Sequence, residues 1–488
     1  MEFNLEDKFI NYTEPVSPLG QTFSTSLLSV CVQAIFELER PMDVCSAKKA
    51  IRDILLPSNP RFCCLMTEDT NGVLRWEKTE VNVDDHVIVP EFRAGQNDYD
   101  EFVNDYICNI HLTPLQKCRP LWEFHFLNYN TSNARATLII NMHHSLGDGT
   151  SLMALVFGCV TRADNPNLRL TFPSSTSLPK KTSSLYCSWA FSEFFYGMLH
   201  RLFMLVLVML YTVSDFIVSL LRMGWMEDSK TPIRGPPGVE LLPKVMSSVI
   251  FPIEEIRKIK DSVGGTVNDV VMGIIFYGLQ QYLKNALPLG YKIAPVEHKA
   301  APNELKMSNL RVTGLVTMNT RAISGQKSIE EMLKPNSETP WGNRFGLLQI
   351  PIPMTDMKNP VDYVRKAKQI IDRKKLSVEV FVTSRLLGFV GRQASAACFY
   401  KTLANTTLVI SNMVGPKEKV AMNRIPIKSF YFSISGLPQT LLLTVVSYMG
   451  SVRIEVIGAK GYVDSETLAK HFGESFEEMR DISIARRR

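Results

Sequence analysis

A nineteen-residue apolar segment near the middle of the chain limits the folds that are open to it. Phe203–Leu221 reads FMLVLVMLYTVSDFIVSLL, which is just long enough to cross a bilayer as a helix. The Pro/Ser/Thr-rich stretch Asn165–Ser184 precedes it, and the breaker Thr231–Gly238 (TPIRGPPG) follows it. We therefore expect an N-terminal domain over 1–185, a hydrophobic membrane-associated insert and linker over 186–238, and a C-terminal domain over 239–488.

Four polar residues indicate how a helix over this segment lies. Thr212, Asp215, Ser219 and Arg222 recur at intervals of three and four residues, so they form one narrow stripe on a helix. A central Asp opposes spanning, because it costs about 2.5–3.5 kcal/mol on insertion scales. A single span would also place the two halves on opposite sides of the membrane, although both are expected to build one site. We therefore expect a helix in the membrane interface, or one packed on the protein with its apolar side in lipid, and a buried core helix is the alternative.

Both halves of the chain mix strand and helix patterns. In the first half, Ala136–His143 (ATLIINMH) is predicted to be a central strand, and Ser151–Ala163 is predicted to be helical. In the second half we expect a helix over Val267–Leu283, capped by Thr266, and a basic exposed helix over Asp362–Lys375. The pattern indicates a mixed α/β (α+β) fold that is duplicated across two halves. The strands expected near the C-terminus are Leu408–Ser411, Ile427–Ser435, Leu441–Tyr448 and Val452–Ile457.

Composition argues against several classes of protein and of site. Nine cysteines without a CxxC pair or a framework spacing indicate reduced thiols and argue against a structural zinc site. A net charge of +6 over 488 residues is mild, and no aromatic-rich basic patch indicates nucleic-acid binding. The first twenty residues lack an apolar core and do not resemble a secretory signal. Any membrane attachment is therefore expected from the internal segment.

The residues that follow the predicted strand over 136–143 carry the clearest chemical signal. They read HHSLGDG, from His143 to Gly149. Neighbouring strand residues point to opposite faces, so one imidazole can face a reaction space while the other supports the fold. An imidazole titrates near neutral pH and suits the removal of a hydroxyl proton, although two histidines at a strand end can also be purely structural. We expect Asp148 to bond a basic partner or the backbone and so hold the turn, and Gly147 and Gly149 to permit close backbone approach.

The spacing HHxxxDG, together with motifs along the chain, resembles known enzyme families. By itself it matches the CoA-dependent acyltransferase superfamily, which includes chloramphenicol acetyltransferase-like enzymes and nonribosomal peptide condensation domains. Further motifs, in the right order over essentially the whole chain, resemble the plant wax ester synthase/diacylglycerol acyltransferase family of bifunctional O-acyltransferases. These motifs are Glu14–Pro18, Val83–Val87, Pro120–Glu123, Thr266–Val270, Trp341–Arg344, Ser411–Pro416 and Ile427–Phe430.

The resemblance implies a fold, a reaction and roles for particular residues. The fold is two chloramphenicol acetyltransferase-like domains with a tunnel at their interface. The donor is acyl-CoA as co-substrate, the acceptor is a long-chain alcohol or diacylglycerol, and neither a bound cofactor nor a metal is expected. By the motif match, His144 is the proton acceptor, His143 supports it, Asp148 is structural and Gly149 completes the motif. No acyl-enzyme is needed, which agrees with the absence of a GxSxG nucleophile elbow.

The same resemblance implies a location. Plant relatives act at the endoplasmic reticulum, and long-chain alcohols and diacylglycerols dissolve in bilayers. We therefore expect the chain at the endoplasmic reticulum membrane, bound to membrane lipid through residues 203–221. Its catalytic domains are expected to face the cytosol, and the plasma membrane is a second expected location.

Some family positions depart from the pattern or serve other purposes. Met413-Val414 stands where many relatives carry Val-Pro, and Asn319-Thr320-Arg321 where they tend to carry Asn-Leu-Arg; both can alter tunnel shape or acceptor preference. Asn268 and Asp269 match a motif with a role in domain architecture rather than in chemistry. Two other functions stay open. One is a soluble-substrate acyltransferase of the same superfamily, which the missing DFGWG-like element disfavours, and the other is a catalytically silent lipid-binding protein, which the intact HHxxxDG disfavours.

Overall fold

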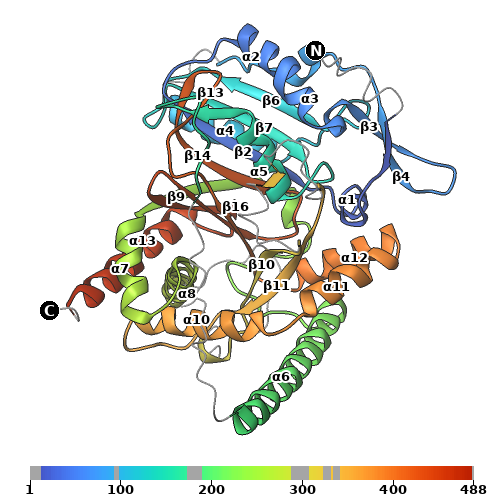
Figure 1. Cartoon of the computed structure of the whole chain (residues 1–488). Helices are drawn as coiled ribbons and strands as arrows, with labels where there is room; N and C mark the ends of the chain where they lie inside the picture. Colours follow the sequence, from blue (N-terminus) through green and yellow to red (C-terminus); the bar gives the residue numbers. More distant parts are fainter. Residues whose placement is uncertain are drawn as a thin grey trace.

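Two β-sheets with helices around them make up the computed structural model of the chain. It describes residues 12–92, 98–172, 190–286, 307–321, 331–332 and 341–485. Figure 1 shows a seven-stranded sheet in the upper half of the molecule and a six-stranded sheet in the lower half. The arrangement confirms the predicted mixed α/β fold with two domains.

The seven-stranded sheet contains the predicted central strand, β7 (Ala136–His143), which is buried along its whole length. Strand β7 pairs antiparallel with β2 (Cys31–Leu38) and β6 (Trp122–Leu127). Apolar residues on one face of these strands pack under helix α5 (Gly149–Gly158), in a core that reaches Phe432 of β14 (Ile425–Ser435). The other strands of this sheet are β5 (Val87–Ile88), β8 (Val160–Arg162), β13 (Val420–Met422) and β14 (Ile425–Ser435).

Strands β13 and β14 come from the C-terminal part of the chain but lie in the N-terminal sheet. Strand β14 pairs with β2 from Ile427↔Leu38 to Ser435↔Cys31, and β13 pairs with β8. The predicted C-terminal segment, 239–488, therefore does not fold as a separate block. Periodicity does not reveal this exchange, because β14 has the pattern of an ordinary strand whichever sheet receives it.

The six-stranded sheet holds the other predicted C-terminal strands and packs against helices on both faces. Its strand order is β11-β10-β12-β15-β16-β9. The strands are β9 (Lys244–Pro252), β10 (Thr313–Asn319), β11 (Phe345–Pro351), β12 (Leu408–Val414), β15 (Leu441–Tyr448) and β16 (Ser451–Ala459). A small third sheet contains β1 (Thr13–Pro15), β3 (Cys64–Glu68) and β4 (Leu74–Lys78).

Helix boundaries confirm most of the predictions and correct one. Helix α8 begins after Thr266, whose hydroxyl accepts from the Asp269 backbone N–H at 3.2 Å, as the predicted cap requires. The predicted helix over Ser151–Ala163 is wrong at both ends. Helix α5 starts at Gly149 under the Asp148 cap and ends at Gly158, and the β-branched pair that follows forms β8 instead.

The remaining helices divide between the two domains. In the N-terminal part they are α1 (Pro18–Thr22), α2 (Val44–Ala50), η2 (Ile51–Leu55), α3 (Leu56–Ser58), η3 (Pro60–Cys63), η4 (Val83–His86), α4 (Tyr99–Ile110) and α5 (Gly149–Gly158). The others are α6 (Ala190–Gly224), η5 (Val239–Leu241), α7 (Ile253–Val263), α8 (Val267–Ala286), η7 (Met307–Asn309), α10 (Val361–Lys375), α11 (Glu379–Phe389), α12 (Arg392–Ala404) and α13 (Ser465–Ala485).

Helix α6 contains the predicted apolar segment and is mostly exposed. Residues Tyr196–Gly224 are long and apolar enough to cross a membrane by length and composition, and 11% of their most apolar window is buried. This low burial excludes the alternative of a buried core helix. Figure 1 shows α6 projecting from the lower edge of the second domain, below α11.

The predicted polar stripe attaches α6 to the second domain. Each of its residues bonds a partner there: Thr212 with Val378, Asp215 with Lys374, Ser219 with Glu379 and Arg222 with Thr313. Large apolar side chains away from this stripe are exposed, including Leu202, Phe203, Leu210, Val213, Ile217 and Leu220. The helix therefore presents an apolar outer face while its polar face is bound to protein.

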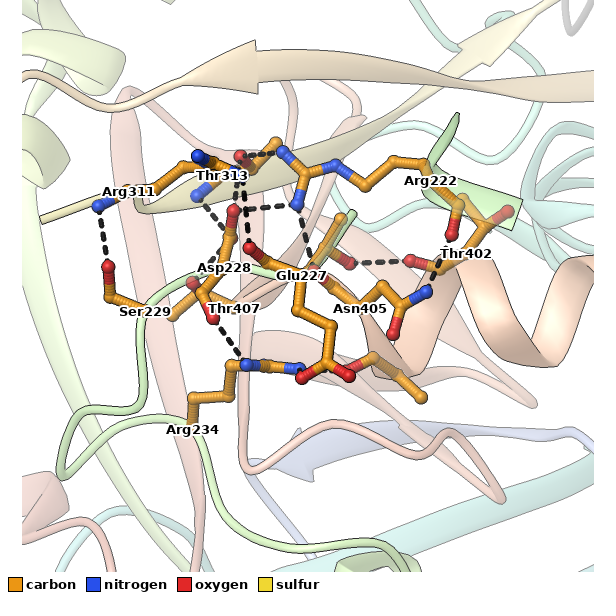
Figure 2. Close-up of polar contacts among 12 residues, drawn as sticks. Arg222, Glu227, Asp228, Ser229, Arg234, Arg311, Thr313, Thr402, Asn405 and Thr407 are labelled. Carbon is orange, nitrogen blue, oxygen red and sulfur yellow. Dashed lines mark hydrogen bonds and ion pairs between the residues drawn. The ribbon is translucent and has the colours of Figure 1, made fainter. Parts of the chain in front are cut away.

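A buried ion pair fixes the C-terminal end of α6 (Figure 2). Nη1 of Arg222 donates to Oδ1 of Asp228 at 2.7 Å and to the Asn405 carbonyl at 2.8 Å. The other carboxylate oxygen of Asp228 accepts from the Thr313 backbone N–H and the Thr407 hydroxyl, both at 2.7 Å. Both carboxylate oxygens of Asp228 therefore have donors, as a buried charge requires. The same bonds hold this end of α6 to β10 and to the turn after α12.

Candidate active site

His144 lies directly after β7, where the two domains meet. Its Nδ1 is 2.8 Å from Oδ1 of Asn343, which belongs to the second domain. Nδ2 of Asn343 donates to the backbone carbonyl of His144, also at 2.8 Å. That carbonyl only accepts, so the amide orientation is fixed and Oδ1 must accept from Nδ1–H. The His144 tautomer therefore carries its proton on Nδ1 and leaves Nε2 as a basic lone pair.

Burial keeps the His144 ring neutral. The side chain packs against the rings of Phe23 and Phe345, whose centroids are 4.9 Å and 5.4 Å from its own. Burial lowers the pKa of His144 from its usual value, and the charge of Asp148 and the bond to Asn343 oppose this only in part. A neutral imidazole at neutral pH is the form that can accept a proton.

His144 lines a cavity of about 190 Å³ to which both domains contribute. The N-terminal sheet and α5 contribute Val32, His144, Asp148, Gly149, Thr150, Phe432 and Ile434, and the second domain contributes Thr317, Met318, Asn319, Phe345 and 411–414. The wall includes Met413 and Val414, which depart from the family pattern, and Asn319, which adjoins the departure at Thr320. They are therefore placed where they can shape what the cavity accepts.

His143 points elsewhere, as the alternation of strand residues predicts. Its Nδ1 is 2.7 Å from the Ser145 hydroxyl and accepts the Ser145 backbone N–H at 3.2 Å, and its Nε2 is 3.4 Å from the Ser29 hydroxyl. Burial lowers the pKa of His143 to about 3. The ring is a neutral hydrogen-bonding group inside the N-terminal domain and does not line the cavity.

Asp148 joins the motif to the second domain. Its carboxylate accepts from both terminal nitrogens of Arg321, at 2.7 Å and 3.1 Å, and from the Arg344 backbone N–H at 2.8 Å. Oδ1 also accepts the Ser151 backbone N–H at 3.0 Å and so caps α5. Asp148 thus bonds a basic partner and the backbone, which are the contacts expected from the sequence.

Tight packing around the turn explains one glycine of the motif. A Cβ on Gly147 would lie 2.8 Å from Cβ of Ser151 and 3.2 Å from Nε1 of Trp341, so a side chain there has no room. A Cβ on Gly149 would meet Met413 at an ordinary 3.4 Å. Gly147, rather than Gly149, is the position where close approach requires glycine.

Sequence reasoning did not assign a role to three residues that complete the site. Asn343 orients His144, Arg321 pairs with Asp148, and Asn319 lines the cavity. Oδ1 of Asn319 accepts the Arg321 backbone N–H at 2.9 Å, whereas its buried Nδ2 has no hydrogen-bond partner among the described residues. All three lie in segments that the sequence analysis compared with the family, Trp341–Arg344 and 319–321. The comparison did not indicate what each residue does.

Asn268 and Asp269 lie at the start of α8 and do not line the cavity of His144. Asp269 accepts the Thr266 backbone N–H at 2.8 Å, and Asn268 accepts from Nδ2 of Asn412 at 2.8 Å. These contacts are architectural, in keeping with the expectation. Within the described ranges, no group of three or more His, Cys, Asp or Glu side chains is arranged to hold a metal ion.

Two family models match the chain. The wax ester synthase/diacylglycerol acyltransferase catalytic domain matches residues 56–271, and the WS/DGAT C-terminal domain matches residues 341–480. Wax ester synthase/diacylglycerol acyltransferase 9 of Arabidopsis thaliana is 30% identical over 96% of this chain and 95% of its own length. Wax ester synthase/diacylglycerol acyltransferase 11 of the same plant is 29% identical over 91% and 89%.

Solved structures support the same fold. The wax ester synthase/diacylglycerol acyltransferase from Marinobacter aquaeolei VT8 has a TM-score of 0.60 at 16% identity and covers 96% of this chain and 100% of its own. The starter condensation domain of rhizomide synthetase has a TM-score of 0.54 at 12% identity, covering 99% and 97%. The chain therefore belongs to the wax ester synthase/diacylglycerol acyltransferase family and is an acyltransferase.

Proposed function

We propose that the chain transfers the acyl group of an acyl-CoA to a long-chain alcohol or a diacylglycerol, with His144 as general base. The observation that carries the proposal is the Nδ1–H bond from His144 to Asn343, which leaves Nε2 free to take a proton inside the interdomain cavity. The acceptor classes come from the names of the relatives.

The proposed reaction needs one base and one donor to the oxyanion. Nε2 of His144 takes the hydroxyl proton as the alcohol oxygen attacks the thioester carbonyl. The tetrahedral oxyanion then accepts a hydrogen bond from Nδ2 of Asn319, the buried N–H in the same cavity that has no partner among the described residues. Collapse breaks the C–S bond, and the CoA thiolate takes the proton from the imidazolium. The ester and CoA are the products, and the ring is neutral again.

Ester synthesis by membranes that carry the chain tests this proposal. Microsomes with the wild-type protein are given labelled palmitoyl-CoA with hexadecanol or with diacylglycerol, and the products are separated. Labelled wax ester or triacylglycerol is expected well above the level of microsomes without the chain. No product with either acceptor would remove the proposed activity, and saturable lipid binding without turnover would favour the silent lipid-binding alternative.

We further propose that α6 lies in the membrane interface of the endoplasmic reticulum with its apolar side in lipid, and that both domains face the cytosol. The polar stripe supports this pose, because Asp215 and Arg222 are bound to the second domain and a spanning helix would draw that domain into the bilayer. Many large apolar side chains of α6 are exposed together, and such a patch marks a surface that contacts lipid or another protein.

Charges on the outer face of α6 are expected to release the protein from membranes. The variant Leu210→Glu/Ile217→Glu should show at least about tenfold less sedimentation with liposomes, because burial of one such side chain contributes about 1.5–3 kcal/mol. The matched control is Leu168→Glu/Leu241→Glu, which alters two exposed apolar residues outside α6. Equal sedimentation of both variants, or protease cleavage of the two domains from opposite sides of a vesicle, would disprove the interface pose.

A further inference from the structure

A second, small cavity, of about 40 Å³, lies between α6 and the cavity of His144. Helices α6, α11 and α12 and strand β11 line it, and we refer to it as the helix-side cavity. Ser219 and Met223 of α6 form one wall and Leu387 of α11 another. Since α6 carries the exposed apolar face, the helix-side cavity lies directly behind the surface proposed to contact lipid.

One aromatic residue, Phe345, lies between the helix-side cavity and the cavity of His144. Phe345 lines both of them, and its ring centroid is 5.4 Å from that of His144. Phe23 stacks on Phe345 at 6.0 Å, and Phe399, another wall of the helix-side cavity, contacts Phe23 edge-on at 5.4 Å. The two cavities therefore share Phe345, whose ring belongs to the aromatic group that packs against the general base.

The hydroxyls of Ser384 and Thr402 bond carbonyls of their own helices, and the other polar side chains that line the helix-side cavity form one hydrogen-bonded group of Ser219, Gln349, Glu379 and Thr383. Nε2 of Gln349 donates to the Ser219 hydroxyl at 3.0 Å, and that hydroxyl donates to Glu379 at 2.6 Å. Gln349 is 6% exposed, and its Oε1 has no donor among the residues that the structure describes. A buried carbonyl oxygen without a donor is unfavourable, and a ligand hydroxyl can supply one.

We propose that the helix-side cavity binds the hydroxyl-bearing lipid acceptor on its way from the bilayer at α6 to His144. Oε1 of Gln349 accepts a hydrogen bond from the hydroxyl, the apolar walls contact the part of the alkyl chain next to it, and Phe345 lies between this acceptor and the acyl-CoA in the cavity of His144. The inference rests on the proposed function and adds to it a lipid-side entrance for the acceptor. Acyl-CoA, which is soluble in water, has no need of this entrance.

Filling the cavity tests the proposal with a neighbouring control. Leu387→Trp places bulk inside the cavity, whereas Leu386→Trp makes the same change one residue away, on the exposed side of α11. In liposomes, Leu387→Trp is expected to lower kcat/KM for hexadecanol by at least about tenfold relative to Leu386→Trp, since a single methylene in an apolar pocket changes it by about 10–200-fold. With water-soluble 1-butanol, the two variants should agree within twofold. Equal values with both alcohols would overturn the proposal.

A second variant removes the polar group without adding bulk. Gln349→Met is expected to raise KM for hexadecanol by about 2–10-fold, which corresponds to one hydrogen bond, and to leave kcat and the KM for palmitoyl-CoA near those of the wild type. A fall in kcat with unchanged KM would overturn the role of Gln349. Ester formation by the wild-type protein decides the proposed function separately, because it does not depend on the ratio between variants.

Discussion

Replacement of His144 with alanine is expected to reduce ester formation by about 10²–10⁴-fold, the contribution of a positioned general base. The ring is held by Asn343 and packs against Phe23 and Phe345, so its loss removes the base without breaking an ion pair. Protein abundance and membrane attachment should be unchanged. The measurement is the initial rate with palmitoyl-CoA and hexadecanol, normalised to protein.

Two further variants make the His144 result specific. His144→Gln keeps most of the side-chain bulk but cannot act as a base, and it should be as inactive as the alanine variant. His471→Ala makes the same change on α13, where the imidazole contacts Glu474 outside the interdomain cavity, and it should retain wild-type activity. A His144→Ala rate above a tenth of wild type would show that another group removes the proton.

Asn319→Asp is expected to lower kcat by about 10²–10³-fold, as the loss of an oxyanion donor does in other enzymes. The substitution keeps Oδ1, which accepts from Arg321, and replaces the N–H donor with an oxygen of similar size. An oxygen in that place repels the developing oxyanion instead of stabilising it. The measurement is kcat for ester formation, with KM for palmitoyl-CoA expected to change little.

The same substitution at Asn412 is the matched control. Asn412 lies in the same cavity, but its Nδ2 already donates to Asn268 at 2.8 Å. We therefore expect a much smaller loss of kcat for Asn412→Asp. If Asn319→Asp and Asn412→Asp lose activity equally, added negative charge in the cavity explains the loss and Asn319 is not the oxyanion donor.

Much of the fold can be predicted from local patterns in the sequence. Strand Ala136–His143 and the start of α8 after Thr266 are local features, because an apolar β-rich run and a helix cap are visible within a few residues. The placement of β14 beside β2 is not local. It depends on a pairing between residues about 400 positions apart, and either sheet could accept the same strand pattern.

For the same reason, the sequence predicts only the part of the candidate site that lies within the HHxxxDG motif. The motif shows His144 and Asp148 together because they are four residues apart. Asn343 and Arg321, which orient and pair with them, approach only when the two domains meet. The choice of tautomer at His144 depends on that distant amide, so residue types around the motif cannot supply it.

The polar stripe on α6 is a case in which spacing was sufficient. Thr212, Asp215, Ser219 and Arg222 share one face by helix geometry alone, and all four bond to the second domain. Their individual partners, such as Glu379 for Ser219, lie far away in sequence and were not predictable. The helix-side cavity could not be predicted either, because its lining residues come from α6, β11, α11 and α12, which are separated in sequence.

A single-turnover measurement tests the central claim, base-assisted transfer at His144, most directly. Wild-type protein in liposomes that contain hexadecanol is mixed with less than one equivalent of labelled palmitoyl-CoA, and His144→Ala is treated in parallel. The account predicts that label passes from palmitoyl-CoA to wax ester in one step in the wild type, with none on the protein, and that the variant leaves the palmitoyl-CoA unchanged. Labelled protein that forms before the ester, or equal conversion by the variant, would contradict the account.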